Sequence, residues 1–329
     1  MRRTAPGTKP DGGAIHAKRD FRRGPGDVRD LMQLLSLKNI LVATDLDQAS
    51  SAAVLTASTL AGAAGACLHA VFVAATQGPR GESVLPAAEP KTALLEMLGR
   101  AAAPIEPANA HVLGGDPAYA ISALADRLHA DVIVLGPHRA PRDAQRARAL
   151  GGTALAVVTT ASAPCLIASQ PLALPLERVL VPIDLSDTAR GALLVGLSWA
   201  SALRGGARRG GESGGATLTA LNIHSPHRGR NQEPGTEALE KELEFVRSEA
   251  GGWAGVSIQG ATAANADVAE GIAGYASDHR PDLVVIGTRG LGLDSSGRLG
   301  SIAAAVTQRL PLPTLLVPPA IWTAHMAAS

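Results

Sequence analysis

The residues whose types and spacing could hold a ligand lie in one stretch, Asp282 to Ser301. Four consecutive apolar residues, Leu283 to Ile286, predict a strand that is covered on both faces. Glycines follow, before an alanine-rich helical pattern begins after Ser301; they are Gly287, Gly290, Gly292, Gly297 and Gly300. Glycine lets backbone N–H groups approach an anion, and the first N–H groups of a helix are unpaired. The stretch therefore predicts a cradle for phosphate.

The spacing of these glycines differs from the two common nucleotide fingerprints. Gly300 is followed by Ser301 without the lysine of a P-loop, and Ser295 stands where the dinucleotide pattern requires a third glycine. The pattern Gly287-x2-Gly290-x9-Gly300-Ser301 instead resembles the ATP-binding loop of the universal stress protein (UspA-like) family. The alternative is a tight strand-to-helix connection that binds no ligand.

This resemblance implies a fold, a ligand and the residues that bind it. The fold is α/β, with two tandem flavodoxin-like (adenine nucleotide alpha hydrolase-like) domains, each a five-stranded parallel sheet flanked by helices. The ligand is ATP, with or without Mg²⁺, whose ribose and phosphates are held by the glycine amides and the Ser301 hydroxyl. Adenine and ribose are expected to meet residues at the ends of two earlier strands, namely Pro182, Ile183, Asp184 and Ile223.

The charged residues of this predicted site have alternative roles. Asp184 follows an apolar strand, so its carboxylate can accept hydrogen bonds from a ribose hydroxyl or the adenine amine. It could instead cap the following helix, although Ser186 or Asp187 could take that role. Arg289, between the loop glycines, either pairs with a phosphate or faces solvent. Asp294 either assists Mg²⁺ or is a solvated loop acid.

The chain contains an internal duplication. The apolar strand 39–46, which contains an aspartate, returns as 178–185 at an offset of 139, and Gly136 returns as Gly287 at an offset of 151. A repeat of this length is a domain repeat. The second copy therefore carries about 12 extra residues, most of them within 204–215.

Strands and helices alternate within each copy, which predicts parallel strands with right-handed crossovers and a ligand beyond the carboxyl ends of the strands. In the second copy, the strand at Val256–Gln259 is expected to be short. The resemblance also implies that the closing strands, Pro164–Ala168 and Pro313–Val317, meet a partner; they should pair domain to domain, as an intramolecular pseudo-dimer, or chain to chain, as a homodimer. The expected segments are a disordered basic tail at 1–35, domains at 36–172 and 176–320, and a C-terminal tail at 321–329.

The first copy departs from the loop pattern. Gly136 is present, but Arg139 stands at the second glycine position and Pro137 lacks a backbone donor. Gly151 comes after eleven residues instead of nine, and Gly152 follows it in place of a serine. We therefore predict one competent nucleotide site, in the second copy.

Composition argues against several classes of protein. A net charge of +1 disfavours a dedicated nucleic-acid or membrane-surface binder, and no apolar run reaches the roughly 18 residues of a transmembrane helix. Cys67 and Cys165 lie in apolar strands and are expected to be small core residues. No His or Cys spacing predicts a metal site. We expect a cytoplasmic protein whose partner is an adenine nucleotide.

No catalytic constellation is visible in the sequence, so we expect at most slow ATP hydrolysis. The leading hypothesis is a nucleotide-responsive stress or signalling module. Two others stay open: a structural or interaction module with an empty loop, and a weak ATP hydrolase or adenylyl-transfer enzyme. The adenylyl-transfer reading requires a Ser-Gly-Gly-x-Asp-Ser loop after the first strand, where this chain has Asp184-Leu-Ser-Asp187.

Overall fold

The computed structural model describes most of the two copies. The described residues are 37–74, 90–101, 103, 105–137, 150–205, 215–225, 235–249, 253, 255–290 and 298–321. The predicted tail at 1–35 lies outside them, as do 322–329. Several residues of the predicted loops also lie outside them, namely Arg139, Gly292, Asp294 and Gly297.

Each half alternates strands and helices, as predicted. The first half contains β1 (Asn39–Ala43), η1 (Gln48–Ser50), α2 (Ser51–Ala64), β2 (Cys67–Ala74), α3 (Pro90–Arg100), η2 (Pro107–Asn109), β3 (Ala110–Gly114), α4 (Pro117–Leu128), β4 (Val132–Leu135), α5 (Gly152–Thr160) and β5 (Cys165–Ile167). The second half contains β6 (Arg178–Pro182), α6 (Asp187–Leu203), β7 (Ala216–His224), α7 (Gly235–Glu249), β8 (Val256–Ala264), α8 (Val268–His279), β9 (Leu283–Gly287), α9 (Ser301–Arg309) and β10 (Thr314–Val317). Most of the predicted insertion, 206–214, lies outside the described residues.

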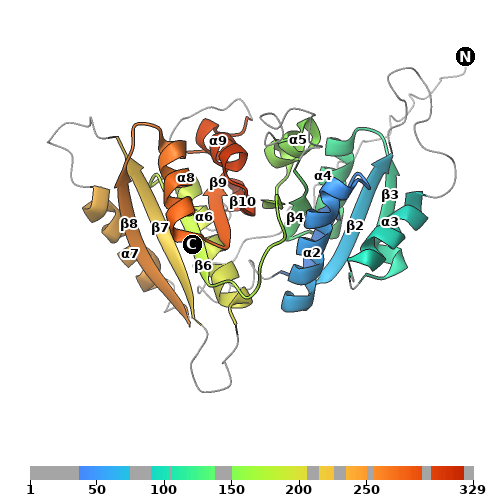
Figure 1. Cartoon of the computed structure of the whole chain (residues 1–329), viewed down its shortest axis with the longest axis horizontal. Helices are drawn as coiled ribbons and strands as arrows, with labels where there is room; N and C mark the ends of the chain where they lie inside the picture. Colours follow the sequence, from blue (N-terminus) through green and yellow to red (C-terminus); the bar gives the residue numbers. More distant parts are fainter. Residues whose placement is uncertain are drawn as a thin grey trace, which may run out of the picture.

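The ten strands form one continuous sheet in the order β3-β2-β1-β4-β5-β10-β9-β6-β7-β8 (Figure 1). Neighbouring strands within each half are parallel. The halves meet where β5 and β10 pair antiparallel, with Leu166 opposite Leu315. The α/β fold with five parallel strands in each half is confirmed; the two sets of strands join into one sheet because the closing strands pair in the predicted domain-to-domain form.

Two apolar clusters cover the two faces of the sheet. One cluster takes its helical residues from α2, α3, α6 and α7, and the other from α4, α5, α8 and α9. Figure 1 shows α5 and α9 side by side above the junction of the halves. Helices therefore cover both faces of the sheet. This explains why β1, β4, β6 and β9 are continuous apolar runs.

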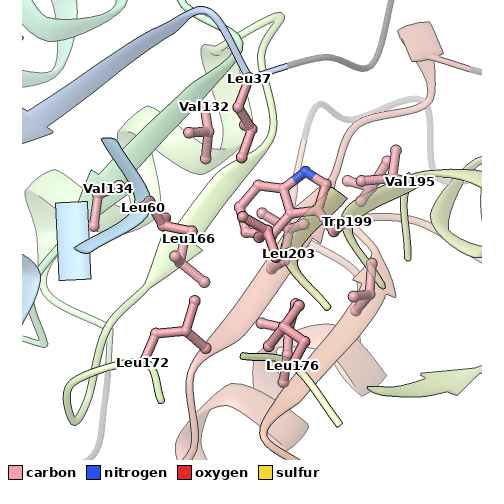
Figure 2. Packing of buried hydrophobic residues seen from close by; sticks show 14 of the residues in the cluster. Leu37, Leu60, Val132, Val134, Leu166, Leu172, Leu176, Val195, Trp199 and Leu203 are labelled. Carbon is pink, nitrogen blue, oxygen red and sulfur yellow. The ribbon is translucent and has the colours of Figure 1, made fainter. Parts of the chain in front are cut away.

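The first cluster crosses from one half to the other. Figure 2 shows Trp199 and Leu203 of α6 in the same cluster as Leu60 of α2. The segment that joins the halves takes part: Leu172 donates its N–H to Thr56 Oγ1 at 3.1 Å, and Leu176 donates its N–H to the Leu203 carbonyl at 2.9 Å. Both leucines are buried. The connection is therefore part of the core.

A repeated aspartate explains one of the sequence matches between the copies. Asp131 precedes β4, and its carboxylate accepts the N–H groups of Lys38 and Asn39, both at 2.8 Å. Asp282 precedes β9 and accepts the N–H groups of Glu177 and Arg178 at 2.9 and 2.8 Å. Each carboxylate thus fixes the start of one strand against the start of its neighbour, which is a structural role in both halves.

Candidate functional site

The strand order brings the predicted site residues of the second half to one place. The chain runs outward from β6 through β7 to β8 on one side and through β9 to β10 on the other. In open α/β sheets, ligands bind beyond the carboxyl ends of the strands at such a reversal. Asp184 follows β6 and Gly287 ends β9, and these two strands are parallel neighbours. Both residues therefore lie at the reversal, on the same edge.

Proline changes the strand pairing below this edge. In the first half, β1 and β4 are in register over four residue pairs, ending at Ala43 and Leu135. In the second half, β6 and β9 are in register over only two pairs, ending at Leu180 and Val284. Pro182 stands at the position of Ala43 and has no N–H group to donate to the ladder. The central pairing of the second half therefore ends earlier, on the side of the candidate site.

Asp184 does not cap the following helix. Ser186 is the N-cap of α6, and its side chain accepts the N–H of Ala189 at 3.2 Å. The Asp184 carboxylate accepts hydrogen bonds from the backbone N–H and the hydroxyl of Ser186, at 3.1 and 2.5 Å. Leu185, between them, adopts a left-handed backbone with φ of 64°. Ser186 therefore caps α6, and the predicted alternative in which Asp184 caps this helix is wrong.

The Asp184 carboxylate lies against the loop that follows β9. A Cβ atom added at Gly290 would overlap Asp184 Oδ2, so only glycine fits there without displacing the carboxylate. At Gly287 an added Cβ would lie 2.8 Å from Thr188 Cγ2, in the first turn of α6. Two of the predicted glycines thus approach side chains of the turn after β6 and the start of α6 closely.

The end of the loop leads directly into α9. Gly300 is the N-cap of α9 and has no side chain with which to cap it, while Ser301 is the first helical residue and is exposed. The Gly300 N–H donates to the Thr288 carbonyl at 2.8 Å, so this amide is already used within the turn. The first turn of α9 and the Ser301 hydroxyl are the remaining polar groups at this end.

The other predicted residues, Ile183, Ile223 and Arg289, differ in their burial and in their contacts at this edge of the sheet. Ile183 is 4% exposed and packs in the first cluster, so only its backbone can face a ligand; its carbonyl accepts the Asn222 side-chain amide at 2.8 Å. Ile223 is half-buried and packs against Gly271 of α8. Arg289 is half-buried and forms no ion pair with a described residue. Asn222 was not predicted, because its role depends on the β6–β7 register.

The first half shows how the same turn looks without the loop pattern. The Asp45 carboxylate accepts the hydroxyl of Ser50, across the extra 3-10 turn η1, and the N–H of Asp47 at 3.0 Å. Gly151 caps α5 with φ and ψ of −61° and 154°, close to the −58° and 143° of Gly300. The ends of the two loops, where α5 and α9 begin, therefore match, whereas 138–149, with Arg139, lie outside the described residues.

His69, His111 and Cys67 form a separate cluster in the first half. His69 Nδ1 lies 3.4 Å from His111 Nε2, and His69 Nε2 lies 3.4 Å from Cys67 Sγ. Burial lowers the pKa of both imidazoles. Burial raises the pKa of the Cys165 thiol to about 12, as expected of a core residue. The core prediction is wrong for Cys67, which is exposed because it begins β2.

Metal-binding groups and membrane-spanning helices are both absent from the described residues. His, Cys, Asp and Glu side chains of the described stretches form no group of three that could hold a metal ion. No helix in the same stretches is both long enough and apolar enough to cross a membrane.

A family model and a curated relative both relate this chain to the universal stress proteins. The model of the universal stress protein family matches residues 36–169 and 175–318. A Thermus aquaticus protein described as "Universal stress protein in QAH/OAS sulfhydrylase 3'region" is 34% identical over 145 residues, which are 43% of this chain and 98% of that protein.

Solved structures show the same architecture. A universal stress protein from Archaeoglobus fulgidus DSM 4304 has a TM-score of 0.57 at 19% identity, over 85% of this chain and 98% of its own. A Pseudomonas aeruginosa UCBPP-PA14 protein assigned to that family has a TM-score of 0.59 at 18% identity, over 90% of this chain and 99% of its own. At these identities the likeness concerns the fold. Because the family model matches nearly all of both halves, the chain belongs to the universal stress protein family.

Proposed function

We propose that this chain binds ATP in its second half and acts as a nucleotide-responsive module. The observation that carries the proposal is the contact between Asp184 and Gly290. It joins the turn after β6 to the loop after β9 at the reversal of strand order, where an open α/β sheet takes its ligands. At this place the Asp184 carboxylate can bind the nucleoside of ATP, and the glycine-rich backbone of the loop can bind its phosphates.

Each predicted residue has a role in this proposal that suits its surroundings. The Asp184 carboxylate accepts a hydrogen bond from a ribose hydroxyl or the adenine amine. Pro182 and Ile223 provide apolar contact for the base, and Ile183 contributes its backbone. The phosphates meet the backbone at Gly287 and Gly290, the start of α9 with the Ser301 hydroxyl, and the Arg289 guanidinium, and they lie beside Gly300, whose own N–H is used within the turn. Bound Mg²⁺ would neutralise part of the phosphate charge.

The proposal places one site in the chain. In the first half, the β1–β4 ladder extends to the edge, ending at Ala43 and Leu135, whereas the β6–β9 ladder ends two pairs earlier. Pro137 and Arg139 also replace bare donors of the loop pattern. The domain limits 36–172 and 176–320 and a cytoplasmic location belong to the same proposal.

Isothermal titration of the full chain with ATP tests the proposal, together with thermal unfolding. ATP at about 100 times its dissociation constant should stabilise the chain by about 2.7 kcal/mol. Gly290→Val should abolish this shift, because the new side chain displaces the Asp184 carboxylate. The matched control is Gly274→Ala in α8, where an added Cβ meets no atom within 4 Å. An ATP shift that persists in Gly290→Val would contradict the proposed cradle.

Mass spectrometry of the freshly purified chain separates this function from its alternatives. Retained ATP agrees with the proposal. Retained AMP or an adenylate would indicate an adenylyl-transfer enzyme or hydrolase instead. A chain that retains nothing and shows no heat on titration with ATP would indicate an interaction module with an empty loop.

A further inference from the structure

An ion pair joins two helices next to the candidate site. Arg190, in the first turn of α6, donates from Nε to Glu242 Oε1 at 2.6 Å and from Nη2 to Glu242 Oε2 at 2.7 Å. Its Nη1 donates to Asp187 Oδ1 at 3.1 Å. The Glu242 side chain, on α7, is only 7% exposed, whereas that of Arg190 is 33% exposed. The guanidinium therefore clamps the start of α6 to α7 through a fork of two parallel hydrogen bonds.

A short series of contacts connects this pair to the loop after β9. The Arg190 N–H donates to the Ser186 carbonyl at 3.0 Å. Ser186 in turn donates its hydroxyl and its N–H to the Asp184 carboxylate. Asp184 then lies against Gly290. Only the turn Asp184–Asp187 separates the ion pair from the carboxylate proposed to meet the nucleoside.

Stability alone gives little reason for this pair. Removing two charged groups from water is costly, and apolar residues of similar volume often replace a buried ion pair without loss of stability. In the first half, Ser51 stands at the position of Arg190 and is exposed, and the buried residues of α3 are Leu94, Met97 and Leu98. The ion pair thus occurs in the half that has the Asp184–Gly290 contact, and in the first half an exposed serine stands at the position of its arginine.

We propose that Arg190 and Glu242 are a positioning pair, which holds the turn Asp184–Asp187 so that the Asp184 carboxylate is oriented toward the nucleoside of bound ATP. This inference rests on the proposed nucleotide site and adds two residues to it that do not touch the ligand. It makes the affinity for ATP depend on α7, a helix outside the loop pattern.

A double-mutant cycle on the full chain tests the pair. The variant R190M/E242L replaces both charges with apolar side chains, and its ATP dissociation constant should rise about tenfold, while its melting temperature stays close to that of the wild type. In the Asp184→Asn background the same two substitutions should have no further effect, because they act through Asp184. Arg190→Lys should lie between the wild type and the double variant, since lysine keeps the charge but loses the fork.

The control is Arg309→Met, which removes the 3.0 Å ion pair of Arg309 with Asp267 between α9 and α8 in the same half. It should leave the ATP affinity unchanged. A folded R190M/E242L chain with wild-type affinity, or losses that add to that of Asp184→Asn, would overturn the positioning role and leave the nucleotide site intact. A wild-type chain that binds no ATP would instead overturn the proposed function, and with it this inference.

Discussion

Asp184 shows how one carboxylate serves two parts of the site at the level of single residues. Its carboxylate accepts hydrogen bonds from the N–H and the hydroxyl of Ser186, which fixes the side chain that caps α6. It also lies against Gly290, so that the turn after β6 approaches the loop after β9 closely. The corresponding Asp45 holds Ser50 across a 3-10 turn instead. The same residue type thus supports two different local structures in the two halves.

This difference predicts the effect of a matched pair of substitutions. Asp184→Asn keeps the shape of the side chain and removes its charge, so ATP should bind at least about tenfold more weakly, as expected for the loss of a hydrogen bond to a charged group. Asp45→Asn, the corresponding change in the first half, should leave the ATP affinity unchanged. Isothermal titration of both full-length variants measures this. Equal losses in the two variants would show that the two halves contribute alike.

The histidine pair of the first half predicts how stability depends on pH. The pKa of both His69 and His111 lies below its ordinary value of 6.5, because burial disfavours the charged rings, and His69, Arg127 and Lys91 add to this at His111. The folded chain therefore binds fewer protons than the unfolded chain below about pH 6.5. Stability is fully present above that pH and falls as the pH decreases below it.

Urea unfolding at pH 7.5 and at pH 5.5 checks this effect. The wild type should lose more stability between the two pH values than the variant H69Q/H111Q, in which neither ring can be protonated. Every other titratable group is common to both chains, so the difference between them isolates the pair. Equal losses in the two chains would exclude a contribution from these rings.

Residue spacing predicted the loop glycines of the site, but not the contacts that depend on which strands are neighbours in the sheet. Gly287, Gly290 and Gly300 could be selected because they lie in one stretch of the chain. The contact of Gly290 with Asp184 could not, since it depends on β6 and β9 being neighbours. The choice between Asp184 and Ser186 as the cap also stayed open, because both residue types cap helices well. Cys67 was predicted to be a core residue because its neighbours in sequence are apolar, but the structure shows that it is exposed.

At the level of elements, the start of α6 links helix stability to the site. Ser186 caps this helix in the half that has the loop pattern, while Asp116 caps α4 in the first half by accepting the Tyr119 N–H at 2.9 Å. Ser186→Ala and Asp116→Ala should each lower the free energy of unfolding by about 1 kcal/mol. Only Ser186→Ala should also weaken ATP binding, because it removes the hydroxyl that orients Asp184.

Chemical unfolding and titration of these two variants give both quantities. A Ser186→Ala chain with wild-type ATP affinity would mean that the backbone N–H of Ser186 suffices to orient Asp184. A loss of affinity in Asp116→Ala would mean that ATP binding follows overall stability and not the local turn.

Element boundaries show where local sequence is a weak guide. The strand expected at Val256–Gln259 continues to Ala264 as β8, although its second part, Gly260-Ala-Thr-Ala-Ala264, is mostly small residues with little strand preference. The reason is pairing: β8 remains in register with β7 from Val256 opposite Ala216 to Ala264 opposite His224. Conversely, the early end of the β6–β9 ladder follows from a single residue, Pro182, and could be anticipated.

At the level of the whole molecule, the two halves share one core. The antiparallel β5–β10 pair makes a single sheet, and the buried connection at Leu172 and Leu176 packs with Trp199 and Leu60 on one face of it (Figure 2). The sequence predicted that the closing strands would pair, but it left open whether they would pair within the chain. Because β5 and β10 are used within the chain, these strands are not free to pair with a second chain. An isolated half would expose the apolar residues of this junction to water.

The shared core predicts that the halves unfold together, and the placement of tryptophan makes this testable. All three tryptophans, Trp199, Trp253 and Trp322, lie in the second half of the sequence, so their fluorescence reports on that half and, through Trp199, on its junction with the first half. Leu124 is buried in the first half, and Leu124→Ala should cost about 2–5 kcal/mol. If the halves form one cooperative unit, this change should lower the melting temperature seen by tryptophan fluorescence, and ATP, proposed to bind in the second half, should raise it again in the same single transition. Two separate calorimetric transitions, with Leu124→Ala moving one and ATP moving only the other, would mean that the junction joins two independent domains.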